Sequence, residues 1–391
     1  MIAVDEAKQL IRAHCQLMPA QQLGLVDAAQ HVLAVDVFAP FDIPYYEQSS
    51  MDGYAFDWAD AKAPLKIIAA VAAGDGTPYR LQPGEAARIF TGAPMPLGAD
   101  TVIMQEKAEI REQHLHIPEG VSEAGDHVRP IGSDVRKDAL AMPAGQLLTP
   151  TALAFLAAMG IDKVEVYAFP KIILVVTGNE LIQPGSAPAH GKVFEASSFG
   201  LRAALADLGL SIIATRHIRD DLSLITAALQ EAIHEADLVL VTGGVSVGDH
   251  DHTAEAAEAC SVQTVFHKVK QRPGKPLFFG VKGKVPVFGL PGNPSSVLTC
   301  FYQYVLEAVS VMTARHLRLK TGKARLLQEY RKPATLTHFL KGVYADGDVR
   351  LSNAQESYKL SAFSSANCFV VIPEETTFVA VDSIVDIHHL P

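Results

Sequence analysis

A glycine-rich turn that leads into two carboxylates stands near the middle of the chain. The stretch TGGVSVGDHD occupies residues 242–251 and directly follows the apolar run DLVLV. Glycines after a strand let backbone N–H groups approach an anion closely, and a serine hydroxyl adds a donor. The pattern fits a phosphate-binding loop and an ordinary structural turn alike, because no G-K-[ST] follows. The residues it nominates are Gly243, Gly244, Ser246 and Gly248.

Carboxylates follow three of the predicted strands. Asp249 and Asp251 end the glycine stretch, Glu180 lies in VTGNEL, and Asp220 with Asp221 lie in IRDD. Asp249 and Asp251 alone are more typical of solvated turn acids. Carboxylate oxygens are the ligands that Mg²⁺ prefers, and several of them near cations favour a metal–phosphate site over an acid–base pair.

Cations cluster in the segment HKVKQRPGKP, in a chain whose formal net charge is −10. They are Lys268, Lys270, Arg272 and Lys275. A solvated basic edge strand is one interpretation of such a run. The alternative is an oxyanion-binding segment, because the Pro-Gly turn would direct Lys275 toward the glycine loops.

A second loop with phosphate-binding character is LPGNPSS, at residues 290–296. Pro294 is expected in the first helical turn, with Asn293 or Ser295 capping the helix, so that free N–H groups face the strand ends. Pro291 and Gly292 complete the loop. An ordinary connecting loop between a strand and a helix, with no binding role, explains the same residues almost as well.

Two further motifs are weak by themselves. In SSMDGYAF, the pair Asp52–Gly53 is typical of a hairpin turn. In FTGAP, Thr91 follows an apolar strand. Neither motif establishes a function alone.

The elements that must position these residues form an alternating series between residues 170 and 315. KIILVVTG, SIIATRHI and DLVLVTGG read as buried strands, and helices with aligned leucines and isoleucines separate them. Strands that are apolar on both faces and alternate with amphipathic helices predict a doubly wound parallel sheet covered on both sides. Ligands bind beyond the carboxyl ends of such strands, which is where the motifs fall.

The remaining chain predicts β-rich modules, so the fold class is α/β plus β. The predicted domains are residues 1–40 with 141–169 (helical and linking), 41–140 (an inserted β-rich domain), 170–317 (α/β) and 318–391 (a C-terminal β module). The acidic composition argues against bulk binding to nucleic acid or anionic membranes. Four scattered cysteines, no signal peptide and no bilayer-length apolar run predict a cytoplasmic protein.

Taken together, the motifs resemble those of the molybdopterin molybdenumtransferases, a family that completes molybdenum cofactor biosynthesis and includes the E domain of gephyrin. The matching stretches are SSMDGYA, RIFTGAPMPLGADTVIMQE, VTGNEL, IRDD, TGGVSVGDHD, RPGKP, LPGNPSS and FSSANCFVVIP. Each one is weak, but their order and spacing over nearly the full length are specific. The resemblance implies a homodimer of elongated four-domain subunits whose α/β domain binds molybdopterin.

The resemblance also implies a reaction. Molybdate and adenylylated molybdopterin are the substrates, Mg²⁺ is the cofactor, and AMP is released as molybdenum enters the pterin; a molybdopterin adenylyltransferase is a further candidate partner. The implied catalytic residues are Asp52, Thr91, Glu180, Asp221, Asp249, Asp251, Lys268 and Arg272, of which Glu180, Asp221, Asp249 and Asp251 hold the metal. The implied substrate-binding residues are Gly243, Gly244, Ser246, Gly248, Lys275, Pro291, Gly292, Asn293, Pro294, Ser295, Asp134, Lys341 and Ser361. Asp52, Thr91 and Asp134 of the second subunit complete each site.

The sequence departs from the family pattern at three places. FEASSF puts Glu195 and Ala196 where many relatives have Asp-Ser-Asn, Arg272 replaces a lysine, and Lys341 replaces an arginine. Because lysine lacks the bidentate geometry of arginine, a paralogue with altered substrate choice stays open. Two other classes also stay open: a molybdopterin adenylyltransferase, against which MDGYA, FTGAP and the C-terminal module argue, and a non-catalytic scaffold.

Overall fold

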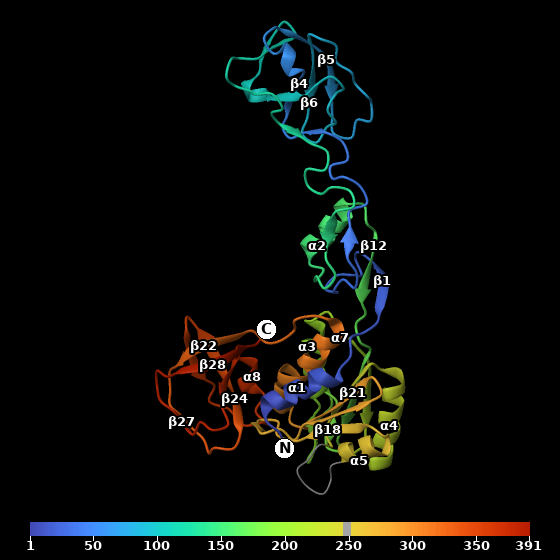
Figure 1. Cartoon of the computed structure of the whole chain (residues 1–391). Helices are drawn as coiled ribbons and strands as arrows, with labels where there is room; N and C mark the ends of the chain where they lie inside the picture. The colour runs from blue at the N-terminus through green and yellow to red at the C-terminus, as the bar shows by residue number, and fades with distance from the viewer. Residues whose placement is uncertain (245–251) are drawn as a thin grey trace. The chain divides into compact units, whose positions relative to one another are not determined.

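The structure is a computed structural model that describes residues 1–244 and 252–391, and its chain divides into two compact units (Figure 1). One unit comprises Met1–Leu23, Ala28–Val32 and Glu165–Pro391, and the other comprises Gly24–Asp27 and Leu33–Val164. The boundaries of the four predicted domains stay a prediction. In the described residues, no helix combines the length and the apolarity that crossing a bilayer requires.

The first unit contains the predicted α/β sheet. Its six strands lie in the order β16-β13-β17-β21-β20-β18, and the first four are parallel. The strands are β13 (Ile172–Thr177), β16 (Ile212–Ile218), β17 (Leu238–Thr242), β18 (Gln263–His267), β20 (Phe278–Lys282) and β21 (Val285–Leu290). The short pair β14 (Leu181–Ile182) and β15 (Val193–Phe194) lies outside this sheet.

The sheet is not parallel throughout, which corrects the sequence prediction. β20 and β21 form an antiparallel pair, and β18 pairs antiparallel with β20. Gly283, at φ 61°, lies in the short turn that joins β20 to β21. A parallel connection needs a crossover of a dozen residues or more, so a turn this short can only return the chain antiparallel.

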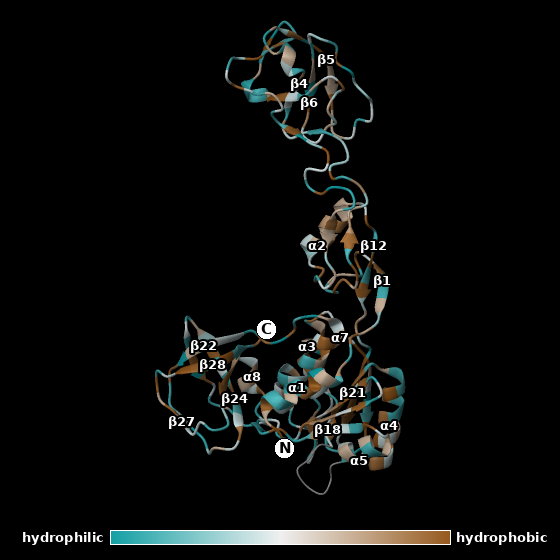
Figure 2. Ribbon diagram, viewed as in Figure 1, coloured by the Kyte–Doolittle hydropathy of each residue, from teal (hydrophilic) through white to brown (hydrophobic). Residues whose placement is uncertain are grey.

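Helices cover both faces of the sheet, as its alternating side chains require. Ile172 and Leu174 of β13 belong to one hydrophobic cluster with α1, α3, α6 and α7, whereas Ile173 and Val175 belong to another with α4 and α5. Figures 1 and 2 show α1 and α3 on one side and α4 and α5 on the other, with hydrophobic strands between them. The helices are α1 (Val4–His14), α3 (Ser197–Ala206), α4 (Leu222–Glu235), α5 (His252–Ala259), α6 (Pro294–Cys300) and α7 (Leu306–Thr313), and a π-helical turn, Phe301–Val305, joins the last two.

The C-terminal module is a closed β-structure in the same unit. Its sheet runs β19-β24-β25-β22-β28-β26, and β24 also pairs with β26, which closes the sheet into a ring. Its elements are β19 (Gln271–Arg272), β22 (Thr321–Leu326), β23 (Tyr330–Arg331), β24 (Thr337–Ala345), β25 (Asp348–Leu351), α8 (Ser361–Ser364), β26 (Cys368–Ile372), β27 (Phe378–Val379) and β28 (Ile384–His389). The cationic segment after β18 therefore leaves the α/β sheet and joins the sheet of this module through β19.

The second unit contains the predicted β-rich domain. A six-stranded sheet in the order β7-β4-β6-β5-β9-β8 forms its centre, and side chains of its own strands, among them Ala55, Ile89 and Val102, belong to an apolar cluster. Its elements include β2 (Val37–Phe38), β3 (Gln48–Ser49), β4 (Gly53–Phe56), β5 (Leu65–Val71), β6 (Glu85–Ile89), β7 (Thr101–Met104), β8 (Glu109–Arg111), β9 (His114–His116), β10 (Val128–Arg129), β11 (Leu140–Met142) and α2 (Pro150–Ala158). The residues of the pair β1 (Ala20–Gly24) and β12 (Lys163–Tyr167) are divided between the two units.

Candidate active site

The glycine turn after β17 lies against the end of β13, and only glycine fits there. Gly243 and Gly244 adopt φ of 86° and 63°. A Cβ on Gly243 would overlap the carbonyl oxygen of Thr177 and lie 2.8 Å from its Oγ1. The Thr253 hydroxyl of α5 donates to Gly243 O at 3.1 Å and fixes the turn. Four predicted site residues lie outside the described residues, namely Ser246, Gly248, Asp249 and Asp251.

The adjacent acids Asp220 and Asp221 have different roles. Asp221 is the N-cap of α4: its Oδ1 accepts from the N–H groups of Ser223 and Leu224 at 3.0 and 3.1 Å and from the Ser223 hydroxyl. These donors lower the pKa of Asp221, the Ser223 hydroxyl most of all. Asp220, by contrast, has a buried Oδ1 without a hydrogen-bond partner in the described residues.

Three unpaired oxygens lie at the carboxyl ends of the parallel strands. In the described part of the chain, Thr177 Oγ1, Thr242 Oγ1 and Asp220 Oδ1 are buried and have no hydrogen-bond partner. A Cβ on Gly244 would lie 3.2 Å from Thr177 Oγ1 and 3.7 Å from Asp220 Oδ1, so these two atoms face the glycine turn. Buried polar atoms cost free energy unless they are paired, and a bound cation or substrate would pair them.

The acids of the described residues do not make a metal cluster by themselves. No group of three or more His, Cys, Asp or Glu side chains is placed to hold a metal among residues 1–244 and 252–391. The Glu180 carboxylate folds back over Gly178, where a Cβ would lie 2.9 Å from its Oε2. Asn179 Oδ1 accepts from the Asp220 N–H at 3.2 Å, which ties the loops that carry Glu180 and Asp220. Oxygen donors of this kind suit Mg²⁺, and Asp220 fits a cation better than Asp221, whose Oδ1 caps a helix.

Two adjoining cavities open at this edge of the sheet. The strand-end cavity, about 530 Å³, is lined by residues 176–177, 180–181, 193–197, 242–243 and 292–294, with Tyr358 and Leu360. The cation cavity, about 510 Å³, is lined by residues 271–276, 291–293 and 356–358, with Ser296 and Leu336. The two cavities share Gly292, Asn293 and Tyr358 as lining residues. Each has the volume of a small-molecule site.

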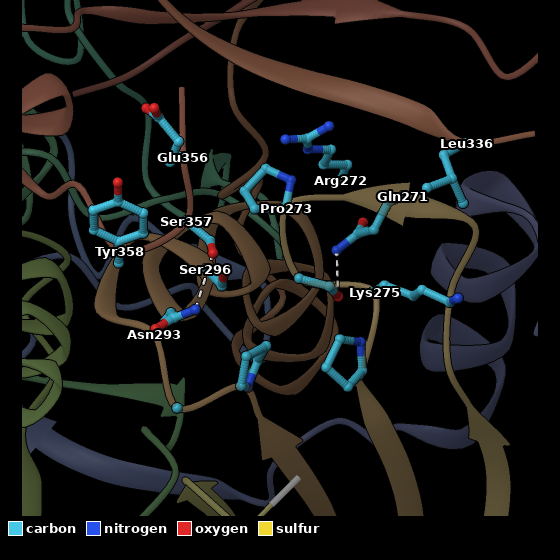
Figure 3. A pocket seen from close by; sticks show the side chains of 14 residues that line it. Gln271, Arg272, Pro273, Lys275, Asn293, Ser296, Leu336, Glu356, Ser357 and Tyr358 are labelled. Atoms are coloured by element: carbon cyan, nitrogen blue, oxygen red, sulfur yellow. Dashed lines mark hydrogen bonds between the residues drawn. The ribbon is translucent and has the colours of Figure 1, made fainter. Parts of the chain in front are cut away.

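The cation cavity brings together segments that are far apart in the sequence. Figure 3 shows the segment from Gln271 to Lys275 on one side and Asn293 with Tyr358 on the other. Arg272 and Lys275 are exposed there. Lys268 is not among the described residues that line either cavity: it lies in the bend after β18 at φ 73°.

The loop LPGNPSS leads into α6 as predicted, but neither predicted side chain caps the helix. Pro294 is the first helical residue, and Asn293 occupies the N-cap position without a side-chain cap. The Asn293 Nδ2 instead donates to the Ser357 hydroxyl of the C-terminal module at 2.9 Å. Ser295 is wholly buried, and its Oγ accepts from Lys341 Nζ at 3.2 Å. Contacts with a distant module therefore replace the local caps.

Lys341 lies beneath this loop and has no exposed surface. Its ammonium group also donates to the Glu356 backbone oxygen at 3.4 Å. Burial lowers the pKa of Lys341, and the nearby Glu356 carboxylate opposes that shift. Ser361, the first residue of α8, is exposed and is not among the described residues that line the two cavities. Sequence reasoning missed residues 356–358, because no local pattern marks them.

Glu195, which the family resemblance predicts to be a departure from the usual pattern, is buried at the start of α3 and lines the strand-end cavity. Its Oε1 accepts from the Ser198 N–H at 2.8 Å, and its Oε2 accepts from the Ser198 hydroxyl. A carboxylate at a helix N-terminus is favoured by the free N–H groups and by the helix dipole. Glu195 thus replaces a capping residue at α3, where Ala196 contributes no cap.

In the second unit, Asp52 and Thr91 form a defined pair. Asp52 Oδ1 accepts from the Thr91 N–H at 2.7 Å and from its hydroxyl at 2.8 Å. Both hydrogen bonds lower the pKa of Asp52, and the one from the Thr91 backbone N–H has the larger effect. The Asp52–Gly53 pair is not a hairpin turn, because Gly53 opens strand β4, where a Cβ would overlap the Ile103 backbone oxygen. Asp134 is exposed, and its N–H donates to the Ile43 backbone oxygen at 2.9 Å.

Three family models match consecutive parts of the chain. They are the MoeA N-terminal region (domain I and II) at residues 2–160, the probable molybdopterin binding domain at residues 173–310 and the MoeA C-terminal region (domain IV) at residues 323–390. The chain is 31% identical to a molybdopterin molybdenumtransferase of Haemophilus influenzae, over 99% of this chain and 98% of that protein. The chain belongs to the molybdopterin molybdenumtransferase family.

Further relatives agree with this assignment. A molybdopterin molybdenumtransferase of Staphylococcus aureus is 32% identical, over 95% of this chain and 91% of that protein. The crystal structure of a molybdopterin biosynthesis MoeA protein from Pyrococcus horikoshii superposes with a TM-score of 0.85 at 28% identity, over 100% of this chain and 99% of that one. The fold and the family resemblance predicted from the sequence are confirmed. The assignment of individual site residues stays a prediction.

Proposed function

We infer that this member of the molybdopterin molybdenumtransferase family inserts molybdenum into molybdopterin, with molybdopterin and molybdate as its substrates. The observation that carries this inference is the pair of adjoining cavities that share Gly292, Asn293 and Tyr358. One cavity presents cations, and the other presents strand-end oxygens that would hold a cation beside the glycine turn, so two anionic reactants can be bound side by side.

The cation cavity suits molybdate. Arg272 and Lys275 line it, and Lys341 lies beneath its loop, bonded to Ser295. Cations and N–H donors compensate the charge of an oxyanion that would otherwise be repelled by an acidic chain. We propose that Arg272 and Lys275 hold molybdate in this cavity, close to the end of the pterin at which the metal is inserted.

The strand-end cavity suits the phosphate-bearing substrate. The Gly243–Gly244 turn faces it, and Thr177 and Thr242 line it. We propose that the pyrophosphate of adenylylated molybdopterin binds at this turn and that AMP is released on metal insertion. Holding both reactants in one place removes most of the entropic cost of their encounter.

We propose Mg²⁺ as the cofactor because the donor atoms at this site are carboxylate oxygens, which Mg²⁺ prefers as ligands. Glu180 and Asp220 offer carboxylate oxygens beside the glycine turn, and Asp249 and Asp251 follow that turn in the sequence. When bound, Mg²⁺ would neutralise charge on the phosphoanhydride. The protein's own part is to orient that bond with the glycine turn.

The second unit contributes Asp52, whose carboxylate Thr91 holds in a fixed orientation. We propose that Asp52 takes part in the reaction, with Asp134, in a homodimer located in the cytoplasm. A docked molybdopterin adenylyltransferase would supply the adenylylated substrate.

The test is a turnover assay with purified protein, adenylylated molybdopterin, Mg²⁺ and molybdate, in which AMP release and cofactor formation are followed together. Both products should appear and depend on molybdate. Lys275→Gln should raise the KM for molybdate, whereas Lys284→Gln, at an exposed lysine outside both cavities, should not. If instead ATP and molybdopterin yield adenylylated pterin and no cofactor forms, the chain is an adenylyltransferase; binding without either product indicates a scaffold.

A further inference from the structure

Beneath the cation cavity lies a buried amide that belongs to the cationic segment itself. Gln271 precedes Arg272 and has no exposed surface. Its Nε2 donates to the Gly274 backbone oxygen at 2.9 Å, so the side chain spans its own turn. Its Oε1 accepts from the Tyr304 hydroxyl. The amide therefore ties the turn to the helical layer below it.

Tyr304 is the fixed end of this connection. It lies in the π-helical turn Phe301–Val305 between α6 and α7 and is wholly buried. Burial raises the pKa of Tyr304 well above its usual value, so its hydroxyl stays protonated and donates. Single π-helical turns inside α-helices occur frequently at functional sites, where they redirect a side chain.

Gly274 leaves no free space between the turn and this layer. Its φ is 81°, and a Cβ there would lie 2.6 Å from Cys300 Sγ and 2.9 Å from Gln271 Nε2. The turn is thus held by the Gln271–Gly274 hydrogen bond within it, by the hydrogen bond from Tyr304 and by the pairing of β19 with β24. Cys300 adds two longer contacts, because its Sγ accepts from Gln271 Nε2 at 3.6 Å and donates to the Gly274 backbone oxygen at 3.7 Å. Buried hydrogen bonds of this kind fix a single backbone conformation, because an unpaired partner is costly.

The two cations of the turn have no comparable support of their own. In the described part of the chain, neither Arg272 nor Lys275 forms a side-chain hydrogen bond or an ion pair. Both side chains are exposed, so their placement depends on the backbone that carries them. That backbone is the one held by Gln271 and Tyr304.

We propose that Tyr304 and Gln271 are positioning residues, which hold the turn 271–275 so that Arg272 and Lys275 converge on the anionic substrate. The proposal rests on the function proposed above, in which these cations bind molybdate. Gln271 lies in the wall of the cavity, but neither its side chain nor that of Tyr304 has exposed surface, so both act through the backbone of the turn.

Hydrogen–deuterium exchange on the full-length protein, without substrate, tests the proposal first. Tyr304→Phe keeps the buried ring and removes only the hydroxyl. The backbone amides of residues 269–272 and 274–275 should exchange about tenfold faster, a factor that corresponds to about 1.4 kcal/mol, while α4 exchanges unchanged. Tyr302→Phe is the matched control, because the Tyr302 hydroxyl forms no hydrogen bond with the described residues. Unchanged exchange in the turn, or equal acceleration in α4, would overturn the proposal.

Turnover then supplies a readout that a purely structural role would not move. Tyr304→Phe and Gln271→Met should each raise the KM for molybdate about tenfold and leave kcat within about threefold, since the cations are displaced but present. The double variant should be no worse than the more affected single variant, because both changes release the same turn. A fall in kcat alone would refute positioning. If the wild type forms no cofactor, the proposed function fails, and the exchange result still decides whether Tyr304 holds the turn.

Discussion

Replacement of Gly243 by alanine measures how closely the glycine turn must approach β13. Two costs add: a left-handed conformation costs a non-glycine residue about 1–2 kcal/mol, and overpacking typically costs about 1–3 kcal/mol. Both apply at Gly243, where φ is 86° and the added Cβ would overlap the Thr177 carbonyl oxygen. Gly243→Ala should therefore lower the free energy of unfolding by about 2–5 kcal/mol.

Gly283→Ala separates these two costs. Gly283 has φ 61° in the turn that joins β20 to β21, but a Cβ there meets no atom within 4 Å, so only the conformational cost applies, about 1–2 kcal/mol. Urea unfolding followed by far-UV circular dichroism gives both values. The single tryptophan, Trp58, lies in the second unit, and its fluorescence transition should not move in either variant. If Gly243→Ala is no less stable than Gly283→Ala, the close approach to Thr177 is not what selects glycine.

Three further outcomes are expected. Thr91→Val removes one hydrogen-bond donor to Asp52, so the pKa of Asp52 should rise. The acid limb of the pH–activity profile should then move to higher pH. If that limb does not move, Asp52 takes no part in the reaction. Burial, with two neighbouring cations, lowers the pKa of His338 from 6.5 to about 4, so the unfolded chain binds more protons between these values. Stability should fall as pH drops from 6.5 to 4, and His338→Asn should flatten that slope in urea titrations. Asp221→Ala should lower the melting temperature, because it removes the cap of α4. Asp220→Asn should instead weaken the Mg²⁺ dependence of turnover. If the Mg²⁺ dependence changes in Asp221→Ala and not in Asp220→Asn, the buried Asp220 oxygen is not a ligand.

Much of the fold and of the site's location follows from local sequence patterns. β13 is apolar except for its last residue, Thr177, and it is buried throughout; a glycine turn or an acid follows each parallel strand. A strand covered on both faces needs such a run, and parallel strands bring their carboxyl ends to one edge. The sequence therefore predicted the sheet edge at which the glycine turns and the acids come together.

Tertiary structure alone decided which polar atoms of each motif already have a partner within the protein and which are left to bind a ligand. Asp220 and Asp221 are indistinguishable in the sequence, yet Asp221 caps α4, whereas Asp220 has a buried oxygen with no hydrogen-bond partner in the described part of the chain. Asn293 was expected to cap α6 and instead bonds Ser357, 64 residues away. Gly53 was expected in a turn but lies in strand β4, and glycine is needed there because the Ile103 carbonyl oxygen occupies the space of a Cβ.

The physical reason is the same in each case. Periodicity and turn composition report how a segment satisfies its own backbone and its apolar face, and these are properties of a few neighbouring residues. The partner of a polar side chain is instead set by competition among groups that only the folded chain brings within reach. The sequence thus determined the elements, their edge and the chemical types present, and the tertiary structure assigned each polar group its partner.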